Sequence, residues 1–68
     1  MTLHSTTRAA AITSLKRIRS KAIDTERLLL LDQLDAHGAL ERASQIEGQA
    51  HVLAIAITQD HEQGALHA

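Results

Sequence analysis

Leu28-Leu29-Leu30-Leu31 is a run of four leucines inside a stretch that otherwise has the periodicity of a long amphipathic helix. Successive residues of a helix are about 100° apart, so these four side chains point almost all the way round the cylinder. One neighbouring helix can cover only one stripe of such a surface. A chain of 68 residues therefore exposes more apolar helix than it can bury alone, which predicts a partner chain.

Two helices account for the apolar spacing on either side of this run. The first is expected at about residues 6–36, with an inward stripe of Ala11, Leu15, Ile18, Ala22, Leu29 and Ala36. The second is expected at about residues 39–59, with an inward stripe of Ala39, Ala43, Ile46, Ala50, Leu53 and Ile57. Residues 37–38 form the turn, because Gly38 suits the left-handed position just past a helix end, and residues 60–68 form a frayed tail.

The predicted fold is therefore all-α, with residues 1–68 as a single domain. It is a two-helix antiparallel hairpin that pairs with its own copy into a homodimeric four-helix arrangement. In the hairpin, the expected pairs are Ile18 with Ile57, Ala22 with Leu53, and Leu29 with Ile46. The run at residues 52–57 also has the composition of a buried strand, but the sequence offers no second strand to pair with it.

Apolar side chains that lie off the inward stripes identify the expected contact with the second copy. On the back of the second helix they share a face with two small residues, and a glycine in mid-helix is compatible with close approach of another helix. The predicted dimer interface is Leu40, Ser44, Gly48, Val52 and Ile55. The alternative for Gly48 is a tolerated glycine that faces solvent.

The two halves of the chain carry opposite charge. Residues 1–27 hold six basic and two acidic side chains, a net of +4, whereas residues 28–68 hold one basic and six acidic side chains, a net of −5. The basic cluster and the leucines beside it could meet an acidic protein surface, or could simply be a solvated helix face. The predicted protein-binding residues are Arg8, Lys16, Arg17, Arg19, Lys21, Arg27, Leu28 and Leu31.

The composition argues against several classes of function. Cysteine and aromatic residues are absent, so the chain has no disulfide, no thiolate and no base-stacking platform. No two of the five histidines are three or four positions apart, no glycine-rich phosphate loop occurs, and His37 suits a helix cap better than a catalytic base. We expect no enzymatic activity, no metal and no cofactor.

The expected location is the cytoplasm. No secretory signal is visible, and the longest apolar run, residues 52–57, is far shorter than the ~20 residues of a membrane span. Nucleic acid is not the expected partner, because a recognition helix after Gly38 would carry Glu41 and Glu47 and only Arg42 to reach a phosphate. A small DNA-binding repressor and a structural dimerisation module are the alternative functions.

The start Met1-Thr2-Leu3-His4-Ser5-Thr6-Thr7-Arg8, the length and the two-helix layout around Ala36-His37-Gly38 carry a resemblance. The chain resembles the small anti-activators of quorum sensing that temperate phages of pseudomonads make early in infection. The resemblance implies a helical homodimer in the host cytoplasm that binds a LuxR-type transcriptional activator and keeps it from DNA. It also implies a second target, the ATPase of type IV pilus assembly, and it assigns no individual binding residue.

Overall fold

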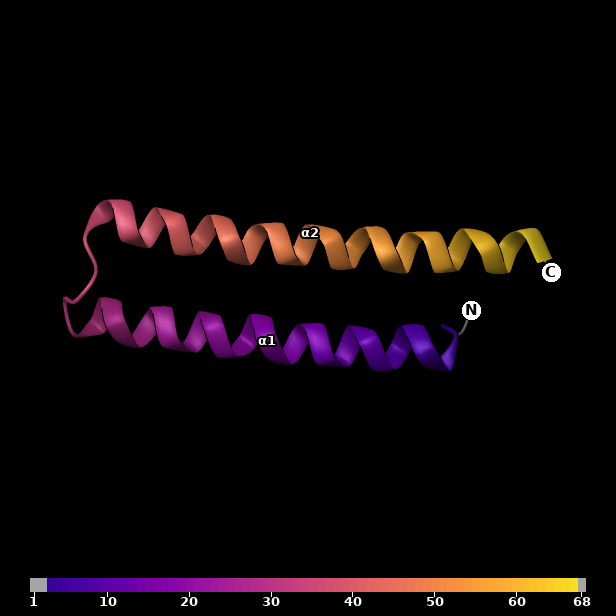
Figure 1. Ribbon diagram of the computed structural model, residues 1–68, viewed down its shortest axis with the longest axis horizontal. Coiled ribbons are helices and arrows are strands. Elements are labelled where there is room, and N and C mark those ends of the chain that lie inside the picture. The colour runs from indigo at the N-terminus through magenta and orange to yellow at the C-terminus, as the bar shows by residue number, and fades with distance from the viewer. Residues whose placement is uncertain (1–2, 68) are drawn as a thin grey trace.

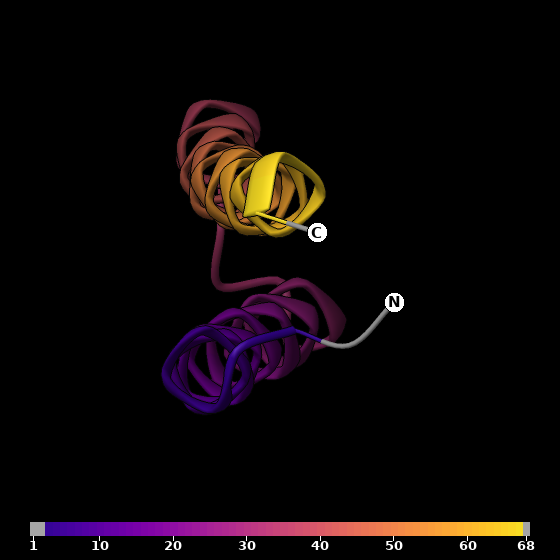
Figure 2. The same cartoon turned by 90° about the vertical axis from the view of Figure 1, so that its right-hand side faces the viewer.

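The computed structural model describes the backbone of residues 3–67 and the side chains of residues 3–63. Two α-helices make up this part of the chain: α1 spans Ser5–Leu30 and α2 spans Ala36–His67. They lie side by side and antiparallel, with the turn at one end and both termini at the other (Figures 1 and 2). The predicted all-α hairpin is confirmed. None of the described helices is both long and apolar enough to cross a membrane.

The two helices meet along a narrow seam with a seven-residue repeat. Ala11, Ile18 and Thr25 form the seam of α1, while Ala39, Ile46, Leu53 and Asp60 form the seam of α2. Among the described side chains only Ala11 and Thr25 are buried, with 7% and 8% of their surface exposed. The Thr25 hydroxyl donates a hydrogen bond of 2.7 Å to the Lys21 carbonyl, which satisfies its polar group inside the seam.

The turn lies earlier in the chain than predicted, at residues 31–35 rather than 37–38. The N–H of Gln33 donates to the Leu28 carbonyl at 2.8 Å and the N–H of Asp32 donates to the Leu29 carbonyl at 3.1 Å, the bond pattern of a Schellman motif. Asp32 has a φ of 55° and takes the left-handed position that we assigned to Gly38. The first helix therefore ends at Leu30 and not near residue 36.

The second helix begins earlier and ends later than predicted. The Asp35 carboxylate accepts a hydrogen bond of 2.7 Å from the N–H of Gly38, so Asp35 is the N-cap of α2 and Gly38 lies in its first turn. At the other end, α2 runs to His67, whereas the sequence suggested an end near residue 59 and a frayed tail from residue 60. Residue 68 of that predicted tail lies outside the described residues.

The shifted turn changes which residues lie level with each other. Asp24 pairs with Arg42 and His4 pairs with Asp60, so level positions have numbers that add to about 64–66. Ile18 is therefore level with residues 46–48, and its predicted pairing with Ile57 is wrong. The predicted pairs of Ala22 with Leu53 and Leu29 with Ile46 fail for the same reason.

The inward stripes are also narrower than predicted. A helix with one neighbour buries only the side chains next to the seam. The side chains that stand four positions after a seam residue therefore point outward. Leu15 and Leu29 are 53% and 51% exposed, and Ala22, Ala36, Ala43 and Ala50 are exposed as well. Leu28, which was predicted to point away, is instead half-buried.

The hairpin is a rod with little interior. It measures 51 × 17 × 13 Å and has a radius of gyration of 15.6 Å, against about 11 Å for a compact chain of this length. Its accessible surface is 5435 Å², while a compact protein of 7.4 kDa has about 4200 Å². One copy thus exposes a surplus of roughly 1200 Å² relative to a compact fold.

Candidate functional site

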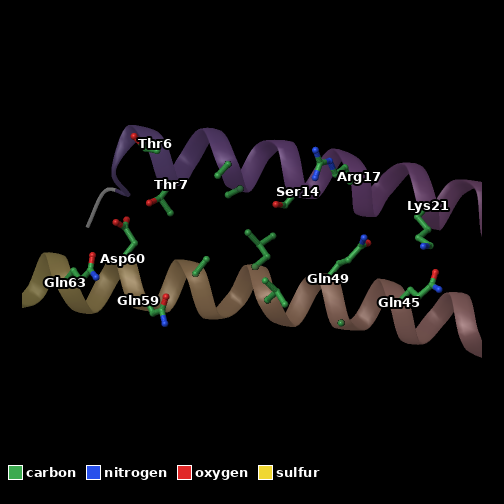
Figure 3. A pocket seen from close by; sticks show the side chains of 16 residues that line it. Thr6, Thr7, Ser14, Arg17, Lys21, Gln45, Gln49, Gln59, Asp60 and Gln63 are labelled. Atoms are coloured by element: carbon green, nitrogen blue, oxygen red, sulfur yellow. The ribbon is translucent and has the colours of Figure 1, made fainter.

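A groove with a volume of about 950 Å³ runs along one side of the hairpin, between the two helices (Figure 3). Lys21 points from α1 toward α2, and Asp60 points from α2 toward α1. A shallower hollow with Asp24, Glu41 and Arg42 continues this side toward the turn. We call it the interhelical groove. Its lining mixes polar with apolar side chains and includes Thr7, Ala10, Ala11, Ser14, Arg17 and Lys21 from α1, and Gln45, Gly48, Gln49, Val52, Leu53, Ala56 and Gln59 from α2.

A side-chain contact between the two arms of the hairpin lies at each end of this side. At the end with the termini, the His4 N–H donates to Asp60 Oδ2 at 3.1 Å and the His4 ring Nδ1 bonds to Asp60 Oδ1. The His4 side-chain hydrogen bond is the main reason that the pKa of Asp60 lies below its ordinary value of 3.8. Near the turn, Arg42 donates to Asp24 at 2.9 Å; this exposed pair contributes ~0–1 kcal/mol.

The opposite side of the hairpin is apolar. Most groove residues outside the seam stand three positions after a seam residue, as Ser14 follows Ala11, or one position before it, as Val52 precedes Leu53. Residues four positions after a seam residue therefore lie on the other side of both helices. We call this side the apolar face, and its residues are Leu15, Ala22 and Leu29 from α1 with Ala36, Ala43, Ala50 and Ile57 from α2.

The residues of this face were predicted to pack against the other helix of the same chain, and in the hairpin they do not. All seven of its residues have the three-four spacing of an inward stripe, and all except Ile57, which is half-buried, are exposed in one copy. The spacing predicts residues of an interior, but it does not say whether a helix of the same chain or of another one would cover them.

The predicted protein-binding residues do not form one surface. Arg17 and Lys21 line the interhelical groove, Leu31 is exposed in the turn, and Leu28 is half-buried. Arg8 is exposed and lies seven residues before Leu15, in the α1 row of the apolar face. The remaining three come together on the outer side of α1, around the apolar side chain of Ile23, which is 46% exposed. We call this group the basic patch, and its residues are Lys16, Arg19, Ile23 and Arg27.

The predicted dimer-interface residues are distributed over the outer side of α2. Gly48 and Val52 line the interhelical groove, and Ser44 and Gly48 share a shallow hollow. Leu40 and Ile55 are exposed. A Cβ built on Gly48 meets nothing within 4 Å, so no part of the hairpin itself requires a glycine there. This set stays a prediction, and the apolar face is a second candidate for self-association.

The side chains that could carry chemistry are dispersed. His37 lies in the first turn of α2, and His37, His51 and His61 are exposed. Within residues 3–63 no group of three or more histidine, aspartate or glutamate side chains is placed to hold a metal ion. Two candidate contact surfaces are left, the apolar face and the basic patch, and they lie on different sides of the rod.

Comparison of the chain with protein-family models, with curated proteins and with solved structures finds no match. The resemblance to the phage anti-activators therefore stays a prediction.

Proposed function

We propose that this protein is a non-enzymatic, protein-binding inhibitor that works as a homodimer. The observation that supports this most is the apolar face, which leaves leucine and alanine side chains in water along most of the rod. The surplus surface of roughly 1200 Å² per copy exceeds the ~800 Å² that each partner buries in a stable interface. A second copy that covers the apolar face would complete the four-helix arrangement that the sequence predicts.

The basic patch is the surface that we assign to the target. It combines three cations with an exposed isoleucine, on a helix whose net charge is +4, and Asp24 at its border is paired with Arg42. Such a surface complements an acidic patch that has an apolar centre, because the charges steer the encounter and the apolar contact slows dissociation. By resemblance, the first targets to test are a LuxR-type transcriptional activator and the ATPase of type IV pilus assembly.

Direct binding with purified components tests this assignment. Calorimetric titration of the wild-type protein into each target should give saturable binding, and Arg19→Glu should weaken it about tenfold or more. Arg17→Glu makes the same charge change in the interhelical groove, outside both the basic patch and the apolar face, and should leave the affinity within about twofold of the wild type. No binding by either target, or equal losses from both variants, would contradict the assignment.

A labelled DNA duplex distinguishes the principal alternative function. Phosphate contacts make affinity fall steeply between about 50 and 200 mM salt, so a DNA-binding repressor would shift the duplex at low salt and release it at high salt. We expect no shift at either salt concentration. A salt-sensitive shift that Arg19→Glu abolishes would replace the inhibitor with a DNA-binding function.

A further inference from the structure

The apolar face has a large edge and a small edge. Level positions of the two helices have numbers that add to about 64–66, as the contacts of Asp24 with Arg42 and His4 with Asp60 establish. Leu15 is therefore level with Ala50, and Leu29 is level with Ala36. Each of these layers places a leucine on the α1 edge and an alanine on the α2 edge. The middle layer, Ala22 with Ala43, is small on both edges, and the layer nearest the start of α1 sets Arg8 on the α1 edge level with Ile57 on the α2 edge.

Two helix hairpins can stack face to face with two-fold symmetry in two ways. In the first, α1 of each copy lies over α2 of the other, and both turns are at the same end. In the second, α1 lies over α1 and α2 over α2, and the turns are at opposite ends. The size pattern of the face and the charges of the helices both distinguish these arrangements.

The size pattern favours the first arrangement. With the turns at the same end, Leu15 of one copy meets Ala50 of the second copy, and Leu29 meets Ala36, so every leucine has an alanine opposite it. With the turns at opposite ends, Leu15 meets Leu29 of the second copy and Ala50 meets Ala36. That pairing forces the rods apart along one edge and leaves a gap along the other, whereas facing large and small side chains fill a core evenly.

The charges favour the same arrangement. α1 carries six basic and two acidic side chains, a net of +4, and α2 carries one basic and four acidic side chains, a net of −3. Stacking α1 over α2 brings opposite charges together on both sides of the dimer. Stacking α1 over α1 and α2 over α2 brings like charges together twice, which opposes association.

We infer that two copies associate through their apolar faces with α1 of each along α2 of the other, so that both turns lie at the same end of the dimer. The inference rests on the proposed homodimer and specifies its geometry. Because the interhelical groove lies on the opposite side of each hairpin, this dimer leaves both grooves uncovered, on its two outer sides.

Distances between spin labels test the arrangement. The chain has no cysteine, so Gln33→Cys introduces one labelling site, in the exposed turn of each copy. Neighbouring helix axes in a bundle are ~8–10 Å apart, so turns at the same end should give label separations of about 20–35 Å by pulsed electron paramagnetic resonance. Turns at opposite ends would give about 50 Å or more, because the hairpin is 51 Å long.

A label in the middle of the rod separates failure of the geometry from failure of the dimer. Ser20→Cys lies on exposed helix near the middle, and either arrangement should bring its two labels within about 40 Å. A signal from Ser20→Cys together with a Gln33→Cys peak near 50 Å would overturn the arrangement and leave the dimer intact. The absence of intermolecular coupling at both sites would overturn the dimer and the arrangement together.

Discussion

Two aspartates decide where the hairpin turns. Asp32 takes the left-handed backbone conformation that ends α1, and Asp35 caps the first turn of α2. Aspartate is among the few non-glycine residues that adopt positive φ with any frequency, but glycine does so far more readily. The sequence therefore pointed to Gly38 as the end of the first helix, and nothing in the spacing of the leucines contradicted that position.

Replacing the cap of α2 should weaken the hairpin. Asp35→Ala removes the acceptor for the Gly38 N–H, and loss of such a cap typically costs about 1 kcal/mol. Urea unfolding followed by circular dichroism should show this loss, while Asp35→Asn, which keeps a capping oxygen, should remain close to the wild type. Equal destabilisation by both variants would mean that the charge, rather than the cap, matters at this position.

Gly48 gives a second prediction that concerns a single residue. Because a Cβ there meets nothing within 4 Å, Gly48→Ala should stabilise α2 by about 0.5–1 kcal/mol through the higher helix propensity of alanine. Gly38→Ala is the matched control, since its Cβ would lie 3.1 Å from both Asp35 Oδ1 and Leu34 Cδ2, and it should not stabilise. A loss of stability in Gly48→Ala would instead place another helix close against that glycine.

Each helix has a seam and, beside it, an apolar edge that the other helix does not reach. The presence, type and pairing of the two helices could be predicted from the sequence because their apolar residues recur at three-four spacing. The sequence could not predict which of these residues form the seam, because Leu15 and Ala22 fit the same stripe as Ala11 and Ile18. Only the register, fixed by contacts such as Asp24 with Arg42, decides which of these residues the hairpin covers.

The contact of His4 with Asp60 ties the start of α1 to α2, and it predicts a pH effect. The pKa of Asp60 is lowered in the fold, so the contact contributes stability above the ordinary value of 3.8 and loses it as the pH falls through the lowered pKa. His4→Ala should return the pKa of Asp60 toward 3.8 in a carboxyl-detected NMR titration. His61→Ala removes an exposed histidine next to Asp60 in sequence and should leave that pKa unchanged; an equal change in both variants would refute the assignment.

The whole molecule is a rod, and its accessible surface exceeds that of a compact protein by at least the area that each partner buries in a stable interface. Its charges are also divided, with α1 positive and α2 negative along its length. Both features are properties of the arrangement and not of any one residue. The sequence could predict the surplus apolar surface from the four leucines. It could not show that Leu15 and Leu29 contribute to that surplus beside the seam, in addition to Leu40, Val52 and Ile55 on α2, because that distinction requires the seam.

Two matched substitutions separate these two faces. Leu29→Glu puts a charge into the apolar face, and because burial of a leucine is worth ~1.5–3 kcal/mol in each copy, it should weaken self-association by a hundredfold or more. Ile55→Glu makes the same kind of change on the outer side of α2 and should have little effect. Sedimentation equilibrium of the two variants measures the difference, and the opposite result would support the back of α2 as the interface.

The mass of the wild-type protein in solution shows whether a second copy covers the apolar face. Light scattering after size exclusion at micromolar concentration should give about twice the 7.4 kDa of one chain, with the mass falling to one chain in Leu29→Glu while the helical circular dichroism persists. A stable, cooperatively folded wild-type monomer of 7.4 kDa would contradict the account, because the apolar face would then remain in water without a partner.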